Sequence, residues 1–483
     1  MTWMSILWVL PALVVLATAA LAADKPSTGG TSASAPAGAS DMPQRAAALA
    51  KEILKGRKTQ FGISAIDLAD GRKLLAIGDR QMLAPASNQK LVTSAVALAT
   101  LGGQYKFATR VYLCGKDIAV VGDCDPTLGD PYIASQDNRD IYADLDKWAS
   151  AIKEKVGDKI DGDLVMYAPA APGGYRHKDW PRGQADNWYA APVTTLNFHD
   201  NCLDVTFQKV DGKLTPVVSP YTRFIDVVNN LKLGSSHRWS LKTTLNDSVA
   251  TFTGTMSQPG DDPVSVAIDN PPLFLGRVLA ERLLKAGLQI GGDLLLVDAR
   301  GFDPAKAQEI CRTETPLAAV MARANKRSLN MAAEGMFLRA CGDWDNGPKL
   351  AQDVLAKSYE LSEGVKIADG CGLSKYNRIC PDAMTRLLAA VTKRPDAQVL
   401  LDSLPVSGVD GTMERRLTEA AYKGRVLGKT GWIAGASALS GYVLGPDKKP
   451  AIAFSIMVNG VPGPADAKRL EDSICKLLVD SIK

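Results

Sequence analysis

A serine and a lysine three residues apart, in Ser87-Asn88-Gln89-Lys90, have the types and spacing for nucleophilic chemistry. The segment lies where Ala84-Pro85-Ala86 enters an expected helix that runs to Leu101. Residues at i and i+3 of a helix share a face, so the amine of Lys90 could accept the proton of Ser87. The partial positive charge at a helix N-terminus also favours a serine there. The pattern predicts a serine nucleophile activated by a lysine.

The pattern S-x-x-K is short, and it also occurs at Ser150 and Ser473. Chance matches of this kind are expected from ordinary amino-acid usage. The alternative interpretation of Ser87 is a helix cap followed by a solvated lysine. No partner motif accompanies Ser150 or Ser473, so we interpret those two as chance matches.

Two further tripeptides accompany Ser87 along the chain. Ser328-Leu329-Asn330 precedes an apolar helical stretch, and Lys429-Thr430-Gly431 opens a run of strands. Taken singly, Ser328 could be a helix cap and Lys429 a strand-edge charge. The order S-x-x-K, S-x-N, K-T-G, with each motif in a suitable element, favours one shared catalytic site.

Composition excludes several other classes of function. There are 56 Lys and Arg against 52 Asp and Glu, a formal charge of +4 with no basic run, so nucleic acid is not expected as a partner. Only three histidines are present, and neither HExxH nor CxxC occurs. The sequence therefore implies no metal and no organic cofactor.

The first residues predict export. Trp3 to Ala22 is apolar and ends in Ala20-Leu21-Ala22, the small-x-small pattern of a cleavage site. We expect a periplasmic or extracellular protein; the alternative is an uncleaved N-terminal membrane anchor, because the segment lacks an early Lys or Arg and is about 20 residues long. Eight cysteines, an even number, fit an oxidising compartment.

Strand-like runs and helices at both ends of the sequence predict an α+β fold, in which one antiparallel sheet combines the two ends and helices pack on its faces. The middle then forms β-rich insert domains, because it contains many short alternating runs and turn clusters. The expected boundaries are a signal peptide at 1–22, a flexible linker at 23–42, the catalytic domain at 43–104 and 312–483, and the insert at 105–311 with a nested subdomain at about 203–267.

With these motifs the sequence resembles the penicillin-recognising serine enzymes, and within them the D-alanyl-D-alanine carboxypeptidase/endopeptidase family, the low-molecular-mass class C penicillin-binding proteins. The resemblance runs from about Pro43 to the C-terminus and includes Asp369-Gly370-Cys371-Gly372-Leu373-Ser374. It implies a β-lactamase/transpeptidase-like fold. The sequence departs from the family pattern at Leu329, Cys371 and Lys375, where Asp, Ser and Arg are usual.

The resemblance also implies roles for individual residues. Ser87 would be the acylated nucleophile, Lys90 its base, and Lys429 a cation that keeps Lys90 partly neutral. Ser328 would relay a proton to the leaving amine. The remaining expected site residues are Asn330, which holds Lys90 and the substrate amide; Thr430, Gly431 and Trp432, beside the substrate; Lys375; and Asp186, which either meets a substrate amine or is a solvated loop carboxylate.

The resemblance implies peptidoglycan stem peptides as substrates and β-lactam antibiotics as inhibitors. The balance of carboxypeptidase and endopeptidase activity stays open, as does pairing of two copies in a homodimer. Two alternatives remain. A β-lactamase would not need the long insert, and a catalytically silent peptidoglycan-binding scaffold would not need five intact catalytic positions.

The cysteine spacing, together with Cys371 at a position where the family usually has Ser, predicts a disulfide from Cys371 to Cys380. A second is expected from Cys114 to Cys124, which flank Gly115 and Gly122. The other four cysteines allow three pairings, of which Cys341 to Cys475 is favoured because both lie on expected helices. Buried free thiols are the alternative.

Overall fold

The computed structural model describes residues 41–56, 58–170, 174–244, 249–260 and 262–482. The expected signal peptide and nearly all of the linker therefore lie outside the described residues. Within the ranges given, no helix has the length and apolar character needed to cross a membrane.

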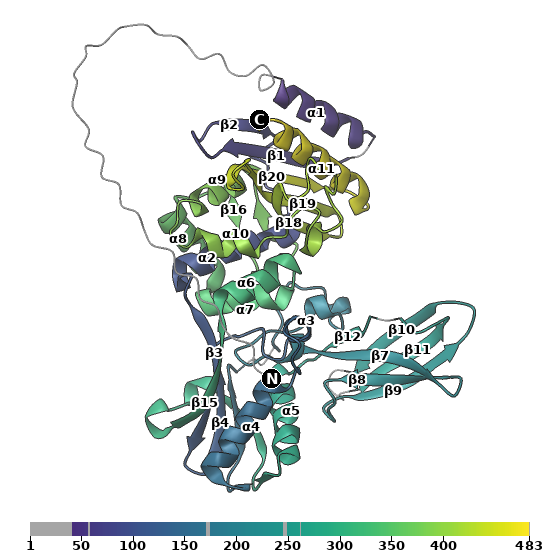
Figure 1. The fold of residues 1–483 in the computed structure, drawn as a ribbon, viewed down its shortest axis with the longest axis vertical. Helices are drawn as coiled ribbons and strands as arrows, with labels where there is room; N and C mark the ends of the chain where they lie inside the picture. The colour runs from purple at the N-terminus through teal and green to yellow at the C-terminus, as the bar shows by residue number, and fades with distance from the viewer. Residues whose placement is uncertain (1–40, 57, 171–173, 245–248, 261, 483) are drawn as a thin grey trace, which may run out of the picture.

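A five-stranded antiparallel sheet joins the two ends of the chain, as predicted (Figure 1). Residues Gln60 to Asp67 pair with Asn459 to Ile452, so the first strand lies directly beside the last one. In spatial order the strands are β18 (Val426–Ile433), β19 (Ala436–Leu444), β20 (Pro450–Asn459), β1 (Gln60–Asp67) and β2 (Lys73–Ile77). The K-T-G motif lies on β18, at an edge of this sheet.

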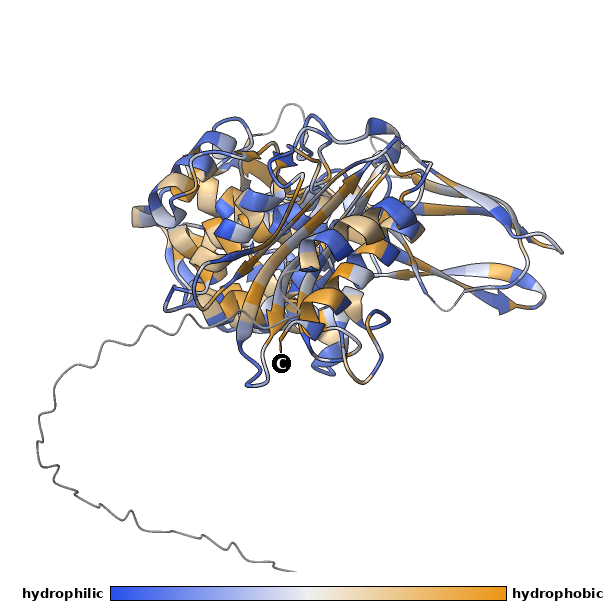
Figure 2. Cartoon of the chain, turned by 90° about the horizontal axis from the view of Figure 1, so that it is seen from above, coloured by the Kyte–Doolittle hydropathy of each residue, from blue (hydrophilic) through white to orange (hydrophobic). Residues whose placement is uncertain are grey.

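Helices cover both faces of this sheet. Alternate residues of its central strands point to opposite sides, so both faces present apolar side chains against which helices pack. In β19, Ala438 and Tyr442 join one core, and Leu439 and Val443 join the other. One face carries α1 (Met42–Ile53) and α11 (Pro464–Asp480). The other carries α2 (Gln89–Leu101), α6 (Leu317–Lys326), α7 (Asn330–Cys341), α8 (Gly347–Tyr359), α9 (Pro381–Val391) and α10 (Ala397–Ser403). Viewed from above, the strands in the middle are largely hydrophobic and the loops around them mostly hydrophilic (Figure 2).

The middle of the chain forms a second five-stranded sheet. It comprises β14 (Leu294–Asp298), β6 (Leu164–Ala168), β4 (Asp117–Gly122), β3 (Lys106–Cys114) and β15 (Gln308–Pro316). Strands β4, β6 and β14 run parallel, because α4 (Ala143–Val156) and α5 (Pro271–Lys285) lie in the connections between them. The alternating runs of the sequence predict β3, β6 and β14, and a helix from Leu273 to Ala286 matches α5, whereas β4, β15 and α4 were not predicted.

Two three-stranded sheets project from this part of the molecule (Figure 1). They contain β12 (Val264–Ala267), β7 (Cys202–Val210) and β8 (Lys213–Ser219), and β10 (Arg238–Thr244), β11 (Val249–Met256) and β9 (Asp226–Leu233). The remaining short elements are α3 (Pro131–Gln136), β5 (Lys159–Ile160), β13 (Gln289–Ile290), β16 (Val365–Lys366) and β17 (Arg378–Ile379).

The predicted disulfides are wrong, because all eight cysteines are free thiols. Cys114 lies at the closed end of the β3–β4 hairpin, whereas Cys124 follows Gly122, which pairs with Thr109. Five residues of extended strand, about 17 Å, separate the two ends of this hairpin, too far for an S–S bond.

The other two favoured pairs are separated by packing. The Cys371 thiol lies 3.8 Å from the carboxylate of Asp369 inside its loop, whereas Cys380 caps α9 and its sulfur faces Gly364. Cys341 and Cys475 belong to the cores on opposite faces of the central sheet. Different surroundings keep the first pair apart and the central sheet separates the second, and spacing along the chain determines neither.

Candidate active site

Ser87 lies in a one-turn 3-10 helix, Ala86–Asn88, immediately before α2. Its neighbour Ala86 has a φ of 48°, a left-handed conformation that is unfavourable for a residue with a Cβ. Two glycines, which have no Cβ, pack closely against this turn. A Cβ on Gly372 would lie 1.9 Å from the carbonyl oxygen of Ala86, and one on Gly431 would lie 3.1 Å from the amide nitrogen of Ser87. The loop at 369–377 and strand β18 thus pack directly against the serine.

Lys90 is fully buried one turn further along α2, and its amine has three hydrogen-bond partners. The Nζ atom lies 3.0 Å from Ser87 Oγ, 2.6 Å from Asn330 Oδ1 and 2.8 Å from the carbonyl oxygen of Cys371. Asn330 begins α7, so α2, α7 and the loop at 369–377 all meet at this amine. The i, i+3 pair predicted from the sequence forms, and Asn330 joins it.

A second lysine and a second serine form another hydrogen-bonded pair in the site. Lys429 Nζ donates to Ser328 Oγ at 2.9 Å and to the carbonyl oxygen of Thr430 at 2.8 Å. Ser328 precedes α7 and has a φ of 60°, so its backbone is also left-handed. The structure therefore brings the S-x-x-K, S-x-N and K-T-G residues together, although 101 and 240 positions separate the two bonded pairs, Ser328 with Lys429 and Lys90 with Asn330.

The pKa values of both buried lysines are lowered, mainly by burial. Burial lowers the pKa of Lys90, and the nearby carboxylates of Asp369 and Glu334 oppose that shift. Burial, followed by the positive charge of Lys90, lowers the pKa of Lys429 well below its ordinary value. A buried lysine with a lowered pKa can accept a proton from a hydroxyl in hydrogen-bond contact, which is the property a base needs.

The remaining predicted residues differ in their surroundings. Thr430 donates to Thr412 Oγ1 at 2.7 Å, and Trp432 is 38% exposed at the rim of β18. Asp186 accepts a hydrogen bond from the hydroxyl of Thr243 in β10. Lys375 is exposed, with its amine 5.3 Å from the ring centre of Tyr376. The substrate contacts expected of Asp186 and Lys375 stay predictions.

The arrangement has a serine hydroxyl in contact with a buried lysine whose pKa is lowered, a second buried lysine, and a strand at the edge of a sheet. Comparison with known proteins agrees with this chemistry. The D-Ala-D-Ala carboxypeptidase 3 (S13) family matches residues 45–480. The chain belongs to this family. It is therefore a peptidase of the D-Ala-D-Ala carboxypeptidase type.

Individual S13 relatives support this assignment. The chain is 29% identical over 458 residues to the D-alanyl-D-alanine carboxypeptidase of Actinomadura sp. (strain R39), covering 87% of this chain and 81% of that protein. It is 25% identical over 399 residues to the D-alanyl-D-alanine carboxypeptidase DacB of Haemophilus influenzae, covering 78% and 80%. The crystal structure of penicillin binding protein 4 (dacB) from H. influenzae has the same fold, with a TM-score of 0.75 and 20% identity over 90% of this chain and 99% of that one.

Two buried carboxylates behind Lys90 in this S13 member were not predicted as site residues. Glu334 accepts from Cys371 N at 2.7 Å and from Trp344 Nε1 at 2.8 Å. Asp369 accepts four N–H groups, from Gly372, Ser374, Asn377 and Trp180. The position of Glu334, one helical turn after Asn330, was an available signal.

Together with the Cys371 thiol, the two carboxylates place ligand-type atoms within 4.8 Å of one another. Each of their four oxygens accepts an N–H group. The cluster therefore stabilises the loop at 369–377 through hydrogen bonds, and its oxygens are already occupied by donors.

Glu334 makes the stability of the S13 fold depend on pH. Burial, with a smaller contribution from the charge of Asp369, raises the pKa of Glu334 from 4.5 to about 7. Between these values the folded chain retains a proton that the unfolded chain has lost, so the free energy of unfolding falls as the pH rises. The total cost above pH 7 is about 3 kcal/mol.

Replacing Glu334 by Gln removes this titration. We expect the free energy of unfolding of Glu334→Gln, relative to the unchanged protein, to rise by about 2 to 3 kcal/mol between pH 4.5 and pH 8. Urea unfolding of both proteins across this range measures the difference. A difference that is the same at every pH would contradict the raised pKa.

Proposed function

We propose that the protein is an exported, serine-type D-Ala-D-Ala carboxypeptidase that acts on peptidoglycan stem peptides through an acyl-enzyme on Ser87. The observation that supports this most directly is the 3.0 Å contact between Ser87 Oγ and the buried amine of Lys90. Membership of the S13 family supplies the substrate class.

The proposed reaction begins when Ser87 Oγ attacks the carbonyl carbon of the penultimate D-Ala and Lys90 accepts the hydroxyl proton. The tetrahedral intermediate then expels the amine of the terminal D-Ala, which needs a proton. Ser328, hydrogen-bonded to Lys429, is suited to relay to that amine the proton that Lys90 took from Ser87, which leaves Lys90 neutral again. Water hydrolyses the resulting ester and restores Ser87.

Two backbone amides are proposed as the oxyanion hole, those of Ser87 and Trp432. The close packing of Gly431 against the amide of Ser87 supports this pairing, because it brings the end of the K-T-G motif beside the nucleophile. Lys429 and Thr430 are proposed to bind the terminal carboxylate. Hydrolysis of a cross-link between two stem peptides needs the same bond changes, so DD-endopeptidase activity belongs to the same proposal.

Release of D-alanine from a peptide ending in D-Ala-D-Ala tests the function. We expect the purified chain to release free D-alanine, and to leave the same peptide ending in D-Ala-L-Ala intact, because with its carboxylate held by Lys429 and Thr430 a terminal L-Ala would direct its Cα methyl group differently from D-Ala. Chiral chromatography separates the products.

Two other results would contradict the proposal. Rapid, repeated hydrolysis of a penicillin without D-alanine release would identify a β-lactamase. Binding of peptidoglycan, with neither D-alanine release nor covalent reaction with penicillin, would identify a silent scaffold.

A further inference from the structure

One segment of the insert, residues 174–190, contacts the groups that hold the amine of Lys90. Apart from Ser87, the hydrogen-bond acceptors of this amine are Asn330 Oδ1 and the carbonyl oxygen of Cys371. The segment reaches the first of these directly and the second through Asp369. We call residues 174–190 the contact segment.

The first connection runs through Asn330. Its Nδ2 donates to the carbonyl oxygen of Tyr189 at 2.7 Å, and its Oδ1 accepts from Lys90 at 2.6 Å. The reverse orientation of the amide would place an NH₂ group against the lysine amine and an oxygen against a carbonyl oxygen. The backbone of Tyr189 therefore determines which atom of Asn330 faces Lys90.

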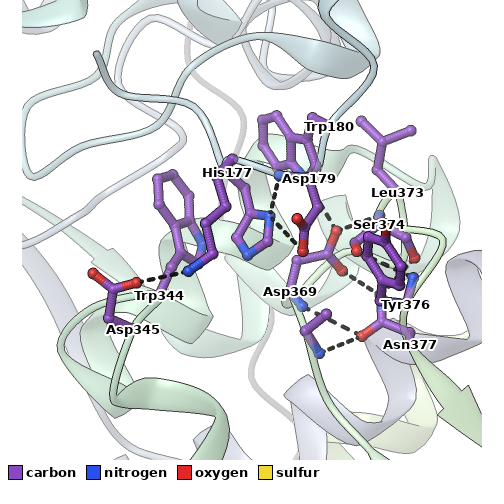
Figure 3. Close-up of polar contacts among 12 residues, drawn as sticks. His177, Asp179, Trp180, Trp344, Asp345, Asp369, Leu373, Ser374, Tyr376 and Asn377 are labelled. Atoms are coloured by element: carbon purple, nitrogen blue, oxygen red, sulfur yellow. Dashed lines mark hydrogen bonds and ion pairs between the residues drawn. The ribbon is translucent and has the colours of Figure 1, made fainter. Parts of the chain in front are cut away.

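The second connection runs through Trp180, whose indole Nε1 donates to Asp369 Oδ2 at 2.9 Å (Figure 3). Asp369 also accepts the backbone N–H of Gly372 at 2.7 Å and of Ser374 at 2.6 Å. These bonds hold the backbone on the C-terminal side of Cys371, whose carbonyl oxygen accepts from Lys90. Trp180 and Asp369 are both buried, so water does not readily replace a lost partner.

The contact segment is itself held in place. Arg176 donates to the carbonyl oxygens of Ala190 at 2.9 Å and Ala185 at 3.1 Å, and it pairs with Asp269. The ring of Trp180 packs edge-on against Trp344, with ring centres 5.9 Å apart. Contacts within the insert thus hold the segment that carries Trp180, and Trp344 of the catalytic domain packs against the indole itself.

We propose that Trp180 is a positioning residue for the base of the proposed reaction: by donating to Asp369 it holds the Cys371 carbonyl against Lys90, so that the contact segment completes the catalytic centre. This inference rests on the proposed function. Without the indole N–H, a buried carboxylate oxygen loses a partner and the loop at 369–377 loses its tie to the insert.

The charged and titratable groups near Lys90 set the direction of the expected change. They are Lys429 on β18, Glu334 on α7, Asp369 and Cys371 in the loop, and Ser87 in the 3-10 helix before α2. A hydrogen bond from a protonated amine to a carbonyl oxygen favours the charged form of the amine. When the Cys371 carbonyl is held less firmly, its bond to Lys90 weakens and the pKa of Lys90 falls further. The acid limb of the acylation profile then moves to lower pH.

Trp180→Phe removes the N–H and keeps most of the apolar ring. We expect the second-order rate of acylation by a chromogenic cephalosporin to fall about tenfold, with the acid limb shifted to lower pH. Trp148→Phe is the matched control. Trp148 is a buried insert tryptophan that also makes one indole hydrogen bond, to Thr313 Oγ1 at 3.0 Å. The acylation rate and the pH profile of Trp148→Phe should equal those of the unchanged protein.

A second variant and a second measurement complete the test. Arg176→Lys keeps the charge but loosens the contact segment, and it should shift the profile in the same direction. The ¹³C signal of Lys90, assigned with Lys90→Arg, reports its titration without any reaction. If Trp180→Phe and Arg176→Lys match Trp148→Phe in both profile and titration, the inference is overturned. If the unchanged protein does not acylate, the proposed function fails, and the Lys90 titration still decides the coupling.

Discussion

Replacing Ser87 by alanine is expected to abolish covalent labelling of the chain by a fluorescent penicillin. A β-lactam carries a strained amide that a nucleophile opens to form an ester, and Ser87 has the buried amine of Lys90 at 3.0 Å to accept its proton. Fluorescence on a denaturing gel measures the label. Peptide mapping of the adduct on the unchanged protein should place it on Ser87 alone.

Ser150→Ala is the matched control, because Ser150 has the same S-x-x-K spacing. Its hydroxyl instead donates to the carbonyl oxygen of Asp146 at 3.0 Å on an exposed part of α4. We expect Ser150→Ala to be labelled like the unchanged protein. An adduct on Ser150 or Ser473 would overturn the assignment of the nucleophile.

Lys90→Arg should reduce the rate of acylation by at least about a hundredfold, because a guanidinium stays protonated and cannot accept the hydroxyl proton near neutral pH. The positive charge remains, so loss of charge would not explain the effect. Stopped-flow measurement of acylation by a chromogenic cephalosporin gives the rate. Circular dichroism before and after heating tests whether the variant is folded.

Lys73→Arg provides the comparison for that substitution. Lys73 begins β2, at the opposite edge of the central sheet from β18, and pairs with Asp382 and Asp79, so its replacement by Arg should leave the acylation rate unchanged. A folded Lys90→Arg protein that reacts at the original rate would assign the base to another group. Lys429 would then be the next candidate.

The sequence by itself determined the class of the fold and the three motifs whose residues meet in the candidate site. The helical i, i+3 spacing of Ser87 and Lys90 is a local property, and so is the alternation of apolar residues in β19 and β20. Local patterns of this kind depend on residues that are close in the sequence and not on how distant elements pack. The strand-like runs at both ends of the sequence predicted one shared sheet, and the order of the three motifs indicated the family.

Some local signals were present but not used. The apolar stripe Leu145, Trp148, Ala149 and Ile152 has the spacing of a helix, and it forms the buried face of α4. The many short alternating runs of the insert favoured strands in that region instead. The helix matters because connections through α4 and α5 allow β4, β6 and β14 to run parallel.

Only the tertiary structure decided what surrounds the amine of Lys90. The bond to Asn330, which the family resemblance implied, spans 240 positions. The bond to the Cys371 carbonyl spans 281 positions and the bond from Trp180 to Asp369 spans 189, and neither was predicted. Contacts at such separations depend on how whole elements pack, which spacing along the chain does not encode. The same reason explains the cysteines: the direction of each thiol follows from packing, and packing left all eight unpaired.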